Sequence, residues 1–171
     1  MSINLDPNEL SRFGWKYAAA FSREGVADAL QSGHNPLNHA GLRDIDYREF
    51  YLEFFRRHLP SLRGIPAVSR LSSFFAVDNI EDARRFILNK PGYPRPPRIY
   101  TVYAIGEHSA YDMTWLDFKF PRNPEKFKYY YEKYWQGKLI DNDPFIAAGH
   151  RGSLREYLIT SNVTIGSSVG E

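Results

Sequence analysis

A strand that runs directly into a capped helix is the feature of this sequence that most constrains its fold. Residues 69–77 combine small hydroxyl side chains with two adjacent aromatic residues, a composition that predicts a strand. Asp78 and Glu81 follow with capping-box spacing, in which a side-chain acceptor precedes a glutamate by three residues. The strand and the helix each have an apolar face that other elements must bury, so the pair predicts a protein that mixes helix and sheet. The residues expected on the buried face of this helix are Ala83, Phe86 and Ile87.

Two further segments carry apolar side chains at helical spacing. The first begins with another capping box, at Asp46 and Glu49, and is expected to end near His58. The second begins at Pro124, a residue favoured at the first helical position, and is closed by Gly137. Each helix therefore has one face to bury. The apolar residues are Tyr47, Phe50, Tyr51, Phe54 and Phe55 in the first, and Phe127, Tyr130, Tyr131, Tyr134 and Trp135 in the second.

Segments rich in β-branched and aromatic residues predict the remaining strands. We expect strands at residues 12–21, 98–105 and 153–165, while residues 113–120 fit either a further strand or an irregular aromatic segment. Residues 166–171 are expected to form a frayed tail. Because strands and helices do not alternate regularly, the predicted fold class is α+β, a compact mixed sheet with covering helices.

The composition indicates a globular protein and narrows the available chemistry. A single domain over residues 1–171 is long enough for a substantial core. The formal net charge of +2 argues against a nucleic-acid binder that depends on phosphate contacts, although a local basic patch stays possible. No cysteine is present, which excludes disulfides, thiolate catalysis and zinc–cysteine sites. No signal peptide or membrane-spanning run is visible, so we expect a cytoplasmic protein, of the producing or the host cell, without a membrane partner.

Glu156 is the acidic residue whose position most needs an explanation. Period-two alternation in the predicted strand places it on the same face as Leu154 and Leu158. A carboxylate on an apolar face is costly to bury unless it is paired. Glu156 is therefore either a catalytic glutamate in a cleft, or a residue of an edge strand or of an ion pair with one of the arginines.

The segment before the capped helix holds further candidate binding residues. Ser72 and Ser73 can bond a backbone or ligand amide, or one can face solvent while the other satisfies a neighbouring loop. Arg70 can hold a phosphate or a carboxylate with two parallel hydrogen bonds, although most arginines are simply solvated. These residues are candidates for ligand binding only if a hollow adjoins them.

Three tyrosines on predicted strands are candidates for ring stacking. Tyr17 lies on the expected first strand, and Tyr100 and Tyr103 lie on a later one. Each could stack on a base or a nicotinamide ring. Each could equally be core or half-buried sheet surface, because aromatic residues make up 16% of the chain.

The remaining polar and charged groups are interpreted as structural. The histidines lack metal-ligand spacing, so no metal site is predicted. The pairs Asp112–Asp117 and Asp141–Asp143 are expected to cap turns. The aromatic helix over residues 127–135 has interleaved lysines, but core packing explains its apolar stripe better than a nucleic-acid platform does.

Two stretches of the chain resemble a known family. Residues 69–76 and 80–86, with the sequences SRLSSFFA and IEDARRF, resemble the second conserved block of ADP-ribosyltransferase-type domains. The later run YWQG at residues 134–137 and the strand with Glu156 are similar to small bacterial and phage domains of this superfamily. The resemblance spans about residues 69–165 and implies an ADP-ribosyltransferase-like fold.

The resemblance also implies an activity and a set of site residues. In such domains a late glutamate, which Glu156 matches, orients the nicotinamide ribose of NAD. A carboxylate beside that ribose can stabilise the positive charge that develops as the nicotinamide bond breaks. The residues expected to bind NAD are then Ser72, Ser73, Phe74, Arg70 and Tyr17, with Arg12 and Lys16 as alternatives to Tyr17 for the first-strand anchor.

Three functions are open at this point. The first is an NAD-dependent ADP-ribosyltransferase, a glycosyltransferase of the bacterial or phage effector kind, whose macromolecular acceptor is a protein or a nucleic acid. The second is a non-enzymatic module, a degenerate copy of the fold, that binds a protein or single-stranded nucleic acid. The third is a structural or host-interaction protein. The enzyme predicts that Glu156 lies in a cleft beside Ser72 and Phe74. The binding module predicts that Glu156 is paired in the open and that a continuous basic-aromatic face is present, and the structural protein predicts neither.

Overall fold

The computed structural model describes residues 44–65, 68–88, 98–118, 124–150 and 152–169. This part of the chain mixes helix and sheet, as the α+β prediction requires. In chain order its helices and strands are α3 (Asp44–His58), β1 (Phe74–Ala76), α4 (Ile80–Leu88), β2 (Ile99–Ala104), β3 (His108–Asp112), α5 (Pro124–Trp135), β4 (Arg155–Ile159) and β5 (Val163–Val169).

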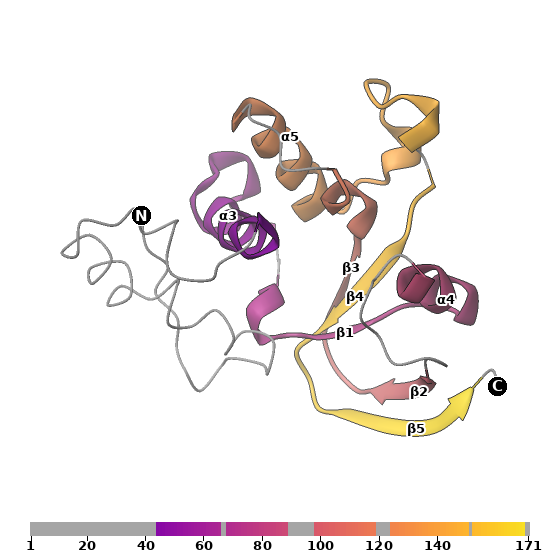
Figure 1. Ribbon diagram of the computed structural model, residues 1–171. Coiled ribbons are helices and arrows are strands. Elements are labelled where there is room, and N and C mark those ends of the chain that lie inside the picture. The colour runs from indigo at the N-terminus through magenta and orange to yellow at the C-terminus, as the bar shows by residue number, and fades with distance from the viewer. Residues whose placement is uncertain (1–43, 66–67, 89–97, 119–123, 151, 170–171) are drawn as a thin grey trace, which may run out of the picture.

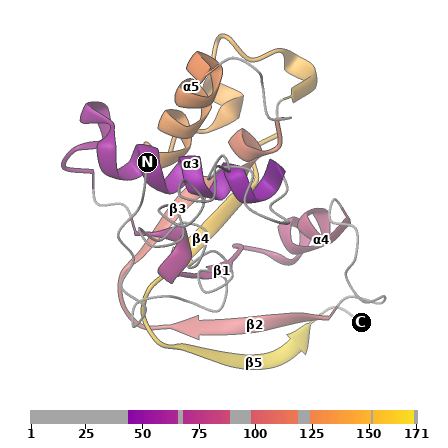
Figure 2. The ribbon, with the colours of Figure 1, turned by 60° about the vertical axis from the view of Figure 1, so that its left-hand side comes forward.

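The strands form two antiparallel sheets, and one bent two-stranded ribbon runs through both of them. One sheet has the order β1-β4-β3 and the other pairs β2 with β5. The chain passes from β2 to β3 and from β4 to β5, so the same two segments pair first in one sheet and then in the other (Figure 2). Gly106 lies at the bend with a φ of +135°, and a Cβ there would stand 2.9 Å from the Cβ of Ser161. The close approach of the two segments thus requires glycine at this point.

The core lies between the three-stranded sheet and two helices. Figure 1 shows α3 and α5 on one side of this sheet and α4 on the other. Trp135 donates its indole N–H to the carbonyl of Leu52 on α3 at 2.8 Å, and Tyr111 of β3 stacks on Tyr134 of α5. These contacts join both helices to the sheet. The largest fully buried apolar side chains are Trp115, Trp135, Tyr134, Leu52, Leu71, Ile140 and Leu158.

The three helices and the strand at residues 98–105 are confirmed. The capping box predicted at Asp46 and Glu49 is wrong, because α3 begins at Asp44 and Glu49 is paired with Arg70. The cap of α4 differs in detail from the prediction, because Asn79 rather than Asp78 accepts the backbone N–H of Asp82, at 2.8 Å. The expected buried face of α4 is only half-buried at Ala83 and Phe86. The predicted strand at residues 12–21 lies outside the described residues.

The prediction of one strand over residues 69–77 is wrong. Residues Arg70–Ser72 form a 3-10 turn, and strand geometry begins only at Phe74. The serines explain the difference, because Ser69 accepts the backbone N–H of Leu71 at 3.1 Å and Ser73 donates its hydroxyl to the Ser69 carbonyl at 2.6 Å. Such local bonds compete with a sheet ladder for the backbone.

Two other strand predictions are corrected by long-range pairing. The segment expected as one strand at residues 153–165 contains β4 and the start of β5, separated by the ribbon's bend. Residues 166–169 belong to β5 and pair with β2, so the frayed tail predicted from residue 166 is wrong for them. In the aromatic segment at residues 113–120, Met113–Leu116 form a buried 3-10 turn, and β3 just before it was not predicted.

Candidate functional site

A buried ionic cluster joins the turn at Arg70 to β4 and to both core helices. Arg70 is 5% exposed and donates from Nε to Oε2 of Glu49 at 2.9 Å. Its Nη1 atom donates to Oε1 of Glu156 and, at 2.8 Å, to the hydroxyl of Tyr134. Tyr134 in turn donates its hydroxyl to the same Glu156 oxygen at 2.7 Å. Arg70 therefore pairs with two carboxylates that stand far apart in the sequence.

The charged side chains at the edge of this cluster are also paired. Glu53, 0% exposed, accepts the Ser69 hydroxyl and the Arg70 backbone N–H, each at 2.9 Å. Arg56 donates to Glu53 at 2.9 Å, and Arg48 donates to Glu49 at 3.1 Å. The cluster thus matches the carboxylates of Glu49, Glu53 and Glu156 with the guanidiniums of Arg48, Arg56 and Arg70.

Burial and neighbouring charges set the protonation states of Arg70, Glu49 and Tyr134 in this cluster. Burial alone would lower the pKa of Arg70, but the charges of Glu156 and Glu49 outweigh it and raise that pKa well above its ordinary value. Burial would raise the pKa of Glu49, but Arg70 and Arg48 outweigh it and lower that pKa. Burial, together with Glu156, raises the pKa of Tyr134 well above its ordinary value. At neutral pH the cluster therefore holds a charged arginine, an ionised Glu49 and a neutral, hydrogen-donating tyrosine.

The structure brings some of the predicted site residues together and separates others. Arg70 and Glu156 form an ion pair, which is one of the alternatives that the sequence left open for Glu156. Ser73 is buried beside them, and the hydroxyls of Ser72 and Ser73 both donate to the carbonyl of Ser69. The three candidates for the first-strand anchor, Arg12, Lys16 and Tyr17, lie outside the described residues.

Phe74 lies on the opposite face of the sheet from Glu156. Phe75 pairs with Leu158, and Leu158 shares a face with Glu156, so Phe75 points toward the ionic cluster. The Arg70 guanidinium lies 4.8 Å from the Phe75 ring. Phe74 alternates to the other face, where it is 39% exposed. The arrangement that the enzyme hypothesis predicted, Glu156 in a cleft beside Phe74, is not the one observed.

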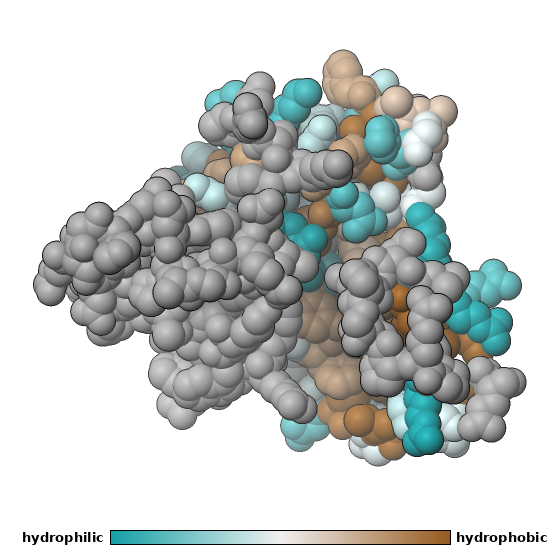
Figure 3. Space-filling model, viewed as in Figure 1, coloured by the Kyte–Doolittle hydropathy of each residue, from teal (hydrophilic) through white to brown (hydrophobic). Residues whose placement is uncertain are grey.

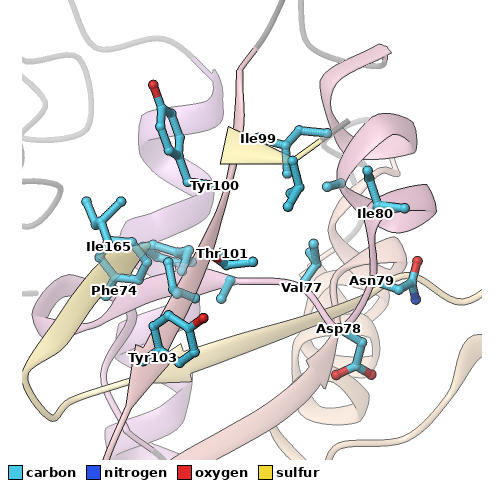
Figure 4. A pocket seen from close by; sticks show the side chains of 15 residues that line it. Phe74, Val77, Asp78, Asn79, Ile80, Ile99, Tyr100, Thr101, Tyr103 and Ile165 are labelled. Carbon is cyan, nitrogen blue, oxygen red and sulfur yellow. The ribbon is translucent and has the colours of Figure 1, made fainter. Parts of the chain in front are cut away.

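The face that carries Phe74 opens into a groove of about 480 Å³. Its walls come from β1 with the start of α4 and from β2 with β5 (Figure 4). Figure 4 shows Phe74, Tyr103 and Ile165 on one side of the opening and Asp78, Asn79 and Ile80 on the other. Asp78 is the only charged residue among the described residues that line it. The lining comprises residues 74–80, Ala83, residues 99–103, Ile165 and Val169.

Large apolar side chains are exposed around this groove. Phe74, Tyr100, Tyr103 and Ile165 all line it, and the last two are 64% and 61% exposed. Ile105 follows β2 directly and is 93% exposed. Figure 3 shows hydrophobic side chains in the lower part of the face in view, where Figure 1 draws β1, β2 and β5. Exposed apolar side chains gathered in one place are typical of binding surfaces.

Tyr157 of β4 lies near the acidic residue of the groove. Asp78, followed by burial, raises the pKa of Tyr157, and Arg155 opposes this shift. The tyrosine therefore stays neutral beside Asp78. Among the described lining residues the groove presents one acidic group, Asp78, beside apolar side chains.

Of the aspartates expected to cap turns, Asp112 and Asp143 do so. Asp112, which is 0% exposed, accepts the backbone N–H groups of Thr114, Leu154 and Ile140 at 3.0, 3.1 and 2.8 Å. Asp141 accepts those of Gly152 and Ser153. Among the described residues no group of histidine and acidic side chains could hold a metal ion, and no helix could cross a membrane.

Sequence reasoning missed Glu49 and Glu53 as members of the ionic cluster. Their spacing of four residues on α3, with Arg56 one turn further on, was an available signal for an acidic stripe. No comparable signal predicted the groove, which depends on the packing of β1 near β2 and β5. Comparisons with protein-family models, curated proteins and solved structures found no match to this chain.

Proposed function

We propose that this chain is a binding module that takes an apolar segment of a partner protein into the groove between its two sheets. The observation that carries the proposal is the groove itself, a hollow of about 480 Å³ with exposed aromatic and aliphatic side chains on its walls. This volume lies within the range of about 300–1,000 Å³ found for ligand sites.

The energetics of the groove favour an apolar occupant. Covering exposed apolar surface contributes about 25 cal/mol per Å². Tyr103 and Ile165 are more than half exposed, so a partner that covers them gains most of the free energy available from burying these two side chains. The ionic cluster contributes no reactive group to this groove, because its residues lie on the other face of the sheet and pair with one another.

A titration with Nile red, a neutral dye that fluoresces in apolar surroundings, tests the proposal. We expect the wild type to bind the dye, and Tyr103→Ser and Ile165→Ser to weaken binding severalfold. Phe145→Ser is the matched control, because Phe145 is 82% exposed but does not line the groove. Equal loss in all three variants, or no dye binding by the wild type, would contradict a binding groove.

A second candidate is NAD-dependent ADP-ribosyl transfer to a macromolecular acceptor. One observation favours it: Arg70, three residues before buried Ser73 in the same turn, pairs with Glu156 from a distant segment, and all three residues are implied by the family resemblance. A carboxylate could stabilise the charge on the ribose, and Arg70 could bind the pyrophosphate if NAD displaced one of its carboxylates. NAD would be consumed as a substrate in this reaction.

Nicotinamide release and label transfer from labelled NAD test this second candidate. We expect activity in the wild type and in Tyr134→Phe, which weakens the cluster without removing the carboxylate, but none in Glu156→Gln. Circular dichroism checks that both variants fold. Transfer that survives in Glu156→Gln would exclude Glu156 as the catalytic group, and a wild type that releases no nicotinamide would exclude the reaction.

A further inference from the structure

We propose that the partner segment is an extended strand that adds to the free edge of β2 and places a basic side chain against Asp78. This inference rests on the proposed binding function, and it specifies the conformation and the charge of the occupant. It is carried by the pattern of residues along the groove, the pairing of β2 and the charge of the lining.

The pattern of lining residues shows that the groove touches β2 along its edge. Side chains of consecutive strand residues point to opposite faces. A surface that meets only one face of a strand therefore meets every second residue of that strand. On β2 the lining includes all of residues 99–103 without a gap. Such a run includes residues of both faces, so the backbone edge of β2 borders the groove.

This edge is open to pairing in the described part of the chain. There β2 pairs with β5 on one side and with no strand on the other. The pairing of β2 with β5 contains a β-bulge, and the extra residue lies in β5, where Gly166 and Ser167 both stand opposite Thr101. The backbone of β2 therefore continues as a regular strand. A Cβ on Gly166 would stand 2.5 Å from the Thr101 hydroxyl, so glycine permits this close pairing. A regular edge of six residues is long enough to template an added strand.

The side chains around that edge specify the sequence of the added strand. Alternate residues of the strand would face the apolar wall that includes Phe74 and Ile80. Asp78 is exposed and is the single charged residue among the described lining residues. A lysine or arginine on the strand would meet this carboxylate, whereas a phosphate would be repelled by it. The charge therefore favours a basic peptide over a nucleic acid.

Fluorescence anisotropy with synthetic peptides tests the proposal. The probe is a fluorescein-labelled hexapeptide of alternating valine and threonine that ends in lysine. Two altered peptides separate its features: one ends in glutamate, and the other is N-methylated at alternate residues, so that it keeps its side chains but loses edge hydrogen bonds. We expect each change to weaken binding about tenfold, the effect of about 1.4 kcal/mol. Asp78→Asn should remove the preference for lysine over glutamate.

The outcomes separate this inference from the proposed function. If the N-methylated peptide binds as tightly as the parent, or if no peptide binds while Nile red still does, strand addition is wrong and the apolar groove remains. If a labelled oligothymidine binds more tightly than the lysine peptide, the inferred occupant is wrong. If Nile red and all peptides fail to bind, both proposals are wrong.

Discussion

The two faces of the three-stranded sheet hold opposite kinds of surface. On the face toward α3 and α5, buried charges are matched by partners, as Arg70 is by Glu49 and Glu156. On the face toward the groove, Phe74 of β1 is left exposed, as are Tyr103 and Ile165 of the neighbouring two-stranded sheet. Polar groups inside and apolar groups outside each carry a free-energy cost, but the first cost is offset within the chain and the second is not. The comparison teaches that the charged side chains of the cluster find partners within the chain, while the apolar side chains around the groove are left open to solvent.

The largest expected effect is the loss of the cluster's central cation. Arg70→Met should lower the free energy of unfolding by about 3–5 kcal/mol, because buried carboxylates lose their partner. Urea denaturation measures the change. The control is Arg84→Met on the exposed side of α4, which should stay within about 0.5 kcal/mol of the wild type. A small loss for Arg70→Met would show that the cluster is not a stabilising centre.

The next effect concerns a buried carboxylate that binds backbone rather than arginine. Asp112→Asn should lower the free energy of unfolding by about 2 kcal/mol, because the new NH₂ group faces backbone N–H donors such as that of Ile140. Exposed Glu107→Gln is the control and should have little effect. If both variants unfold at the same urea concentration, the three bonds to Asp112 contribute nothing to stability.

The ionised state of Glu49 predicts an acid-dependent loss of stability. Its pKa is lower in the folded protein than its ordinary value of 4.5, so its contribution is complete above that value and is lost as the pH falls through the folded-state pKa. The loss is about 1.4 kcal/mol for each unit by which the two pKa values differ. Urea unfolding between about pH 6 and about pH 3 should show a weaker pH dependence in Glu49→Gln. An unchanged pH dependence in this variant would contradict the assigned shift.

The smallest effect on stability is expected in the groove. Tyr103→Ser should change the free energy of unfolding by less than about 0.5 kcal/mol, because its side chain is 64% exposed. Combined with Arg70→Met, it should add no coupling energy, since Arg70 lies in the buried ionic cluster and Tyr103 on the exposed two-stranded sheet. Thermal and urea unfolding of the single and double variants measure both quantities. A large loss in Tyr103→Ser would show that the groove wall is part of the core.

Local sequence patterns predicted the helices well because their signals lie within one or two turns. The apolar stripe of α5 and the closing Gly137 lie where the pattern placed them, and Gly137 donates its backbone N–H to the Tyr134 carbonyl at 2.9 Å. In α3 the predicted Tyr51, Phe54 and Phe55 are only half-buried, and the buried residues are Glu49, Leu52 and Glu53. The face of Glu156 was also predictable, because alternation in β4 places it between buried Leu154 and Leu158. Such patterns indicate which residues are buried, but not which partners they find.

The partners depend on contacts between distant segments. Arg70 and Glu156 are separated by 86 residues, so no local pattern could choose between an ion pair and a catalytic acid. The short strand β1 was overestimated because the serines before it have the composition of a strand but bond to one another in a turn. The strand expected at residues 153–165 was divided by a bend whose position depends on the close approach of Gly106 to Ser161.

The sequence by itself determined the class of the fold, the positions of the helices and the face of the strand that carries Glu156, because helical and strand periodicity report which side chains share a face. Only the tertiary structure decided that Glu156 pairs with Arg70 and that Phe74 opens into a groove on the other face. The physical reason is that side-chain direction along a strand is a local property, whereas the surface that a side chain meets is built by segments far away in the chain.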